Sequence, residues 1–169
     1  MRWINHQTTT ALMVYAATGD VTAATAATLG SVAPDAIEFF FRGLLPHRSL
    51  THWPYLYLAL GAGAYWGWQA GDGLLFFYLL FFVVGALIHL AQDALSPGGI
   101  PWKHPLGVRS GLGLYVPFSR SEFIVALALV VIAGSAIWWN DYHTPLYLAG
   151  ELERVLVVAE YFGRRLRWA

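Results

Sequence analysis

Long apolar runs alternate with short polar segments along this chain. Three windows, at residues 53–69, 74–91 and 123–139, contain no Lys, Arg, Asp or Glu, and each is 17 or 18 residues long. A membrane-spanning helix needs roughly 17–25 such residues. Trp and Tyr gather at the ends of these windows, as they do at membrane–water interfaces. We therefore predict three spanning helices.

The N-terminal apolar stretch, residues 8–34, is interrupted by Gly19-Asp20, and its two halves are rich in Ala and Thr. A Gly-Asp pair is a turn signal, and small residues allow helices to pack closely. The favoured interpretation is a helical hairpin with helices at residues 6–18 and 21–32. The alternative is one continuous helix with Asp20 buried, which would leave His6 across the membrane from the other polar residues.

The C-terminal part begins with a Pro- and Gly-rich loop at residues 96–121. In the tail, apolar residues fall on one helical face, which predicts an amphipathic helix at residues 146–169 that lies on the bilayer or docks on a protein partner. The fold prediction is all-α: a polytopic membrane helical bundle with an N-terminal hairpin, three spanning helices and this tail helix. Residues 1–145 would form a single membrane-embedded domain.

The composition sets the class of protein. Hydrophobic residues make up 57% of the chain, charged residues 12%, and the mean hydropathy is +0.52, which indicates an integral membrane protein. Cysteine is absent, so the sequence offers neither disulfides nor thiolate metal ligands. Ten basic and ten acidic residues give no electrostatic footprint for nucleic acid, and no direct nucleic-acid binding is expected.

Polar side chains collect at one end of the predicted bundle. His89 and Asp93 are four residues apart on the most apolar helix, so they share one face and suit two ligands of one metal ion. Polar groups at membrane depth are energetically unfavourable, so their presence there indicates a function when they face the protein interior. The hairpin and the antiparallel spans bring further candidates to the same end, and the whole set is His6, Asp35, Glu38, His47, His52, His89 and Asp93.

Imidazole and carboxylate ligands favour a divalent metal, zinc first, with manganese or iron as alternatives, and the set suffices for one or two ions. A metal-activated water would be the nucleophile. Either Asp35 or Glu38, whichever is not a ligand, would be the general base. Arginines at the same end, Arg48, Arg109 and Arg120, would bind an anionic group of the substrate or form a rim that faces lipid headgroups.

Four motifs occur in a recognisable order: GSVAPDAIE at residues 30–38, HRSLTHWP at 47–54, GALIHLAQD at 85–93 and SPGGIP at 96–101. Their combination resembles the membrane-bound metal-dependent hydrolase family, YdjM-like proteins described as LexA-binding inner-membrane hydrolases. The resemblance implies six metal ligands, His6, Asp35, His47, His52, His89 and Asp93. Many members read Pro-Asp-x-Asp, whereas this chain has Ile37 at the second acid and Glu38 one residue later.

The arrangement is also distantly similar to zinc-dependent phospholipase C, which implies phosphoester hydrolysis. Together these observations predict a hydrolase-like domain at residues 1–145 that cleaves a phosphoester of a membrane lipid or another amphiphile. Two alternatives stay open: an ion- or proton-coupled transporter, and a non-catalytic scaffold with a structural metal. The expected location is the prokaryotic inner (plasma) membrane, and six basic residues at the site end against four in the tail favour a cytoplasmic site.

Overall fold

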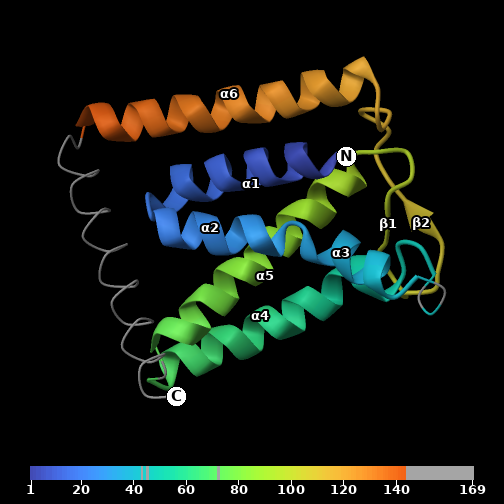
Figure 1. The fold of residues 1–169 in the computed structure, drawn as a ribbon, viewed down its shortest axis with the longest axis horizontal. Helices are drawn as coiled ribbons and strands as arrows, with labels where there is room; N and C mark the ends of the chain where they lie inside the picture. Colours follow the sequence, from blue (N-terminus) through green and yellow to red (C-terminus); the bar gives the residue numbers. More distant parts are fainter. Residues whose placement is uncertain (43, 45, 72, 144–169) are drawn as a thin grey trace.

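The computed structural model describes residues 1–42, 44, 46–71 and 73–143, and these residues are mostly helical (Figure 1). The helices are α1 (Trp3–Thr18), α2 (Val21–Gly30), α3 (Ala33–Phe40), α4 (Pro54–Gln69), α5 (Gly73–Ala94) and α6 (Arg120–His143), with a short 3₁₀ turn, η1 (Leu50–His52). Two short strands, β1 (Ile100–Pro101) and β2 (Arg109–Ser110), pair antiparallel in the loop before α6. The amphipathic helix predicted at residues 146–169 lies outside the described residues.

The N-terminal stretch forms the hairpin and not the continuous helix. Gly19 ends α1 in a left-handed conformation, with a φ of 59° that suits glycine. Asp20 caps α2, and its Oδ1 accepts hydrogen bonds from the backbone N–H groups of Thr22 at 2.8 Å and Ala23 at 3.0 Å. The hairpin therefore returns the chain to the end where α1 begins, and α3 follows there (Figure 1).

The prediction of three spanning helices was wrong in one position. Among the described residues, two helices are long and apolar enough to cross a membrane, Gly73–Ala94 and Arg120–Asn140. The window at residues 53–69 forms α4, whose 16 residues extend about 24 Å, less than a hydrocarbon core of about 30 Å. Pro54 occupies the first turn of α4, and Gly71, with a φ of 105°, follows its end.

Helices α2 and α5 touch backbone to backbone. A Cβ atom added to Gly85 would lie 1.8 Å from the carbonyl oxygen of Ala27, and one added to Gly30 would lie 1.8 Å from that of Phe82. Small residues at both positions permit this approach. Because His89 follows Gly85 by about one helical turn, the contact also fixes how far His89 lies from α1 and α2.

Helix α4 packs on another side of α5 and supports the segment before it. Tyr57 on α4 is buried in one cluster with Val83, Ala86 and Leu90 of α5. Its hydroxyl donates to the carbonyl oxygen of Thr51 at 2.9 Å. The η1 turn, which carries His52, is thereby held against the end of α5.

Replacing Gly85 with Ala should separate α2 from α5, because the added methyl group meets backbone that cannot rotate away. We expect the Gly85→Ala variant to lose about 1–3 kcal/mol of stability. Gly134→Ala is the matched control, since an added Cβ at this position on α6 meets nothing within 4 Å. Thermal unfolding in detergent, followed by circular dichroism, measures both. Equal unfolding temperatures for the two variants would contradict the close contact.

Candidate metal centre

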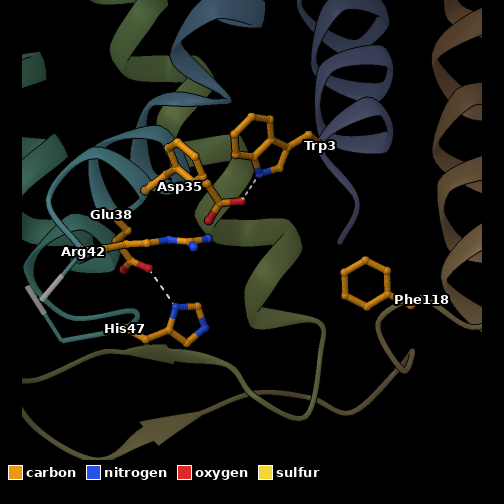
Figure 2. A pocket seen from close by; sticks show the side chains of 7 residues that line it. Trp3, Asp35, Glu38, Arg42, His47 and Phe118 are labelled. Carbon is orange, nitrogen blue, oxygen red and sulfur yellow. Dashed lines mark hydrogen bonds and ion pairs between the residues drawn. The ribbon is translucent and has the colours of Figure 1, made fainter.

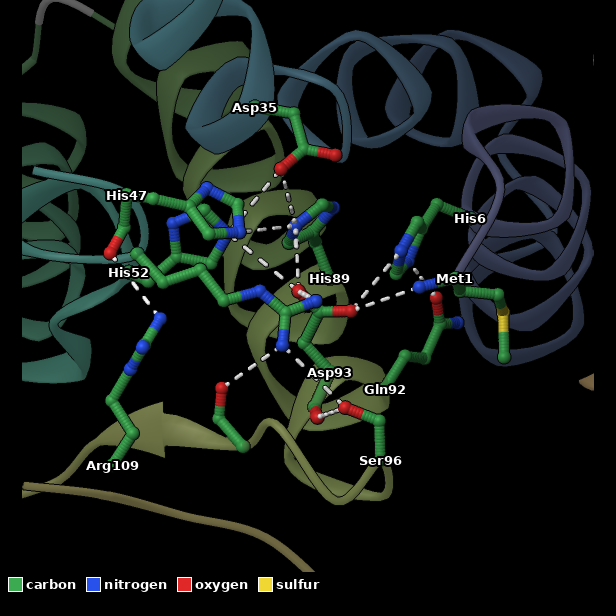
Figure 3. Close-up of polar contacts among 12 residues, drawn as sticks. Met1, His6, Asp35, His47, His52, His89, Gln92, Asp93, Ser96 and Arg109 are labelled. Atoms are coloured by element: carbon green, nitrogen blue, oxygen red, sulfur yellow. Dashed lines mark hydrogen bonds and ion pairs between the residues drawn. The ribbon is translucent and has the colours of Figure 1, made fainter. Parts of the chain in front are cut away.

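Four side chains from α3, η1 and α5 converge near the end of α5 (Figure 3). The Nε2 atom of His52 lies 3.4 Å from Nε2 of His89 and 3.3 Å from Oδ1 of Asp35. Oδ2 of Asp93 lies 3.6 Å from the same His52 atom and 3.7 Å from His89 Nε2. His89 Nε2 is also 3.6 Å from Asp35 Oδ1. Both histidines and Asp93 are buried.

These separations fit a metal ion. Ligands bound to zinc at about 2.0–2.1 Å in a tetrahedron lie about 3.3–3.5 Å from one another. In the described part of the chain, two groups could hold an ion: Asp35, His52 and His89, and His6, His89 and Asp93. His47, predicted as a ligand, belongs to neither group, so its ligand role stays a prediction.

His6 approaches from α1 and stacks on His89, with ring centroids 4.0 Å apart. Its Nδ1 hydrogen-bonds to the Gln92 side-chain oxygen, and the Gln92 amide donates to Thr9 at 2.7 Å. Because these contacts engage Nδ1, the other ring nitrogen of His6, Nε2, is left free. His6 Nε2 is buried, has no hydrogen-bond partner among the described residues and lies 3.5 Å from Asp93 Oδ1. A buried nitrogen in this state is suited to a metal ion.

Glu38 lies on the other side of the His52 ring from Asp35. Its Oε1 is 3.0 Å from Nδ1 of His52 and accepts from the Thr51 hydroxyl at 2.7 Å and from the Arg48 backbone N–H. Its Oε2 is 2.8 Å from Nδ1 of His47. A carboxylate on the far nitrogen of a ligand histidine sets that ring's orientation. The general-base role stays a prediction, and these contacts favour a positioning role.

The carboxylates at this end of the helical bundle attract positive charge. Burial alone would lower the pKa of His52, but hydrogen bonds to surrounding carboxylates, foremost that of Asp35, raise the pKa to about 10. Burial would raise the pKa of Asp35 and that of Glu38, yet hydrogen bonds with His52 help to bring each pKa down to about 2. The His52 ring, with Asp35 at Nε2 and Glu38 at Nδ1, therefore favours a bound cation, either a proton or a metal ion.

Asp93 also contacts two cationic groups. Arg48 Nη2 lies 2.6 Å from Asp93 Oδ2, and the Met1 amino group lies 3.1 Å from Oδ1. Arg48 has a left-handed backbone, with a φ of 50°, and its Nη1 donates to the Gly99 carbonyl oxygen at 3.2 Å. Arg48 thus connects the buried carboxylate to the loop after α5.

The other two arginines predicted to bind substrate lie apart from this cluster. Arg109 is exposed and donates to the His47 carbonyl oxygen at 3.3 Å. Arg120 begins α6 and lines a separate cavity. Substrate binding by Arg48, Arg109 and Arg120 stays a prediction.

A cavity of about 480 Å³ opens beside Asp35 (Figure 2). Asp35 turns Oδ1 toward the histidines, whereas its Oδ2 accepts from the Trp3 indole N–H at 2.9 Å. The remaining walls are charged and aromatic: Glu38, Phe39, Arg42, His47 and Phe118. Asp35 therefore connects the buried cluster with the cavity.

Sequence reasoning missed three residues that shape the site. Gln92 could have been found, because it is a polar residue beside Asp93 on an apolar helix. Arg42 follows a run of three phenylalanines and lies at the same end of the predicted bundle as the arginines that were predicted to bind substrate. Trp3 gave no signal, because its partner Asp35 lies far away in the sequence.

Comparisons with known proteins identify the family of this chain. The model of the family described as YdjM inner membrane protein matches residues 1–163. Comparisons with curated proteins and with solved structures found no match. The family description names the inner membrane, and the two apolar helices fit insertion into a membrane. Because the match covers nearly the whole sequence, this chain belongs to the YdjM inner membrane protein family.

Proposed function

We propose that this protein is a membrane-embedded, metal-dependent hydrolase that cleaves a phosphoester of a lipid or another amphiphile. One observation carries the proposal: the Nε2 atoms of His52 and His89 each lie 3.3–3.7 Å from Oδ1 of Asp35 and from Oδ2 of Asp93, beside an open cavity. This cluster lies at one end of an apolar helix that is long enough to cross a membrane. A substrate held by its acyl chains could reach such a site from the bilayer surface.

Asp35, His52, His89 and Asp93 would hold the first ion, for which zinc is the best match, with manganese or iron as alternatives. His6 and Asp93 would hold a second ion, because Oδ1 of Asp93 faces His6 while its Oδ2 faces His52 and His89. When bound, a divalent metal supplies Lewis-acid chemistry and an activated water.

The chain's own side chains would bind the substrate and hold protons. Arg42 in the cavity wall would bind the anionic phosphoester, with its guanidinium held 4.6 Å from the Phe39 ring. In the hydrolysis, a P–O bond forms to the water oxygen and the ester P–O bond breaks. Glu38 positions His52 and lies outside the proposed ligand set, so it would accept a proton from water. Its partner His47 would give a proton to the departing alcohol oxygen.

Elemental analysis of the detergent-purified protein tests the metal centre. We expect about one or two equivalents of a divalent metal in the unaltered chain and less than about a tenth in the His89→Ala/Asp93→Ala double variant. His104→Ala, which removes an exposed histidine from the loop after β1, should retain the full metal content. Equal helical circular dichroism establishes matched folding. A folded chain that contains no metal and takes up neither zinc nor manganese would contradict the proposal and favour the scaffold.

Hydrolysis can be measured with bis(p-nitrophenyl) phosphate and with dioctanoyl phosphatidylglycerol in detergent, with zinc or manganese added. Arg42→Gln should raise KM about 10-fold or more, with little change in kcat, because it removes a charged hydrogen-bond donor from the cavity. Lys103→Gln, at an exposed loop position outside this cavity, should change KM by less than about twofold. A metal-loaded protein that cleaves neither compound would overturn the hydrolase proposal.

A further inference from the structure

A second cavity, of about 530 Å³, lies between the start of α1 and the start of α6. Phe118 lines both this cavity and the one beside Asp35, so it forms a wall between them. We propose that the second cavity binds the phosphate group of an anionic membrane lipid through Arg2 and Arg120. This proposal does not depend on metal binding or hydrolysis.

The charge of the cavity supports an anionic ligand. Arg2 and Arg120 both line it, both are exposed, and within the described parts of the chain neither guanidinium forms an ion pair. Guanidinium groups match the oxygens of a phosphate. The Arg2 guanidinium lies 5.8 Å from the centroid of the Phe118 ring, which holds it at the rim of the cavity.

The one acidic group in the lining of this cavity is turned inward. Glu122 is 1% exposed, and its Oε1 accepts from the Arg2 backbone N–H at 2.7 Å and from the Asn5 amide at 2.6 Å. Its Oε2 accepts from the Phe118 backbone N–H at 2.6 Å. Both carboxylate oxygens are therefore engaged by N–H donors. Two arginines against one carboxylate leave the lining with a net charge of +1, which favours an anionic ligand.

The apolar walls favour a lipid over a free anion. Ile4, Phe123 and Ile124 also line the cavity, and each is 63% exposed. The candidate spanning segment of α6 begins at Arg120, and Phe123 and Ile124 follow it toward the interior of that segment. Cations at headgroup height above exposed apolar side chains are the arrangement that an anionic phospholipid matches.

Binding of dioctanoyl phosphatidylglycerol to the full chain in detergent, measured by titration calorimetry, tests this site. We expect it to bind at least about 10-fold more tightly than dioctanoyl phosphatidylcholine or inorganic phosphate. The Arg2→Gln/Arg120→Gln variant should lose about 10-fold or more of this affinity. Its fold should persist, because Glu122 contacts the Arg2 backbone N–H and not its guanidinium. If the double variant does not fold, Arg120→Gln alone gives the same comparison.

The control variant Lys103→Gln removes an exposed cation from the same end without touching the cavity, and should change affinity by less than about twofold. Binding should also persist in His89→Ala/Asp93→Ala, which separates this site from the metal centre. Three results would overturn the proposal: equal affinity for the two lipids, equal affinity for inorganic phosphate, or an equal loss in the control variant. Loss of binding in His89→Ala/Asp93→Ala would assign the lipid to the metal centre instead.

Discussion

The buried carboxylate of Asp93 is the constraint on which this end of the molecule depends. It is 1% exposed near the end of a long apolar helix, where an uncompensated charge is strongly unfavourable. Among the described residues it forms ion pairs with Arg48 and the Met1 amino group, and the imidazoles of His6, His52 and His89 lie within 3.7 Å of its oxygens. The helices and loops that carry these groups must therefore meet at the end of α5.

This convergence depends on two local features of the chain. The turn at Gly19-Asp20 reverses the chain, so that α1 delivers His6 and α3 delivers Asp35 to the same end. The glycine contact between α2 and α5 then sets the depth at which α5 packs against the hairpin. Neither feature contributes a ligand atom, yet both determine whether the ligand atoms lie a few ångströms apart or on separate surfaces.

Local sequence patterns predicted the parts of the site that depend on local geometry. The spacing of His89 and Asp93 places them on one helical face wherever the helix lies, and Gly19-Asp20 identifies the hairpin without tertiary information. The charge-free window at residues 53–69 was already at the lower length limit for a span, and α4, which has 16 residues, falls below that limit. The positioning contacts of Glu38 and the engagement of Arg48 with Asp93 arise from long-range packing, for which the sequence has no periodic signal.

Glu122 illustrates how one buried group can organise several elements. A carboxylate in the first turn of α6 is suited to the helix dipole, and this alone would explain its presence. Its oxygens instead accept from the start of α1 and from Phe118, a non-glycine residue held at a φ of 62°. Phe118 forms part of both cavities, and α1 carries Trp3 and His6. The wall between the two cavities and the approach of α1 to the candidate metal centre therefore depend on the same carboxylate.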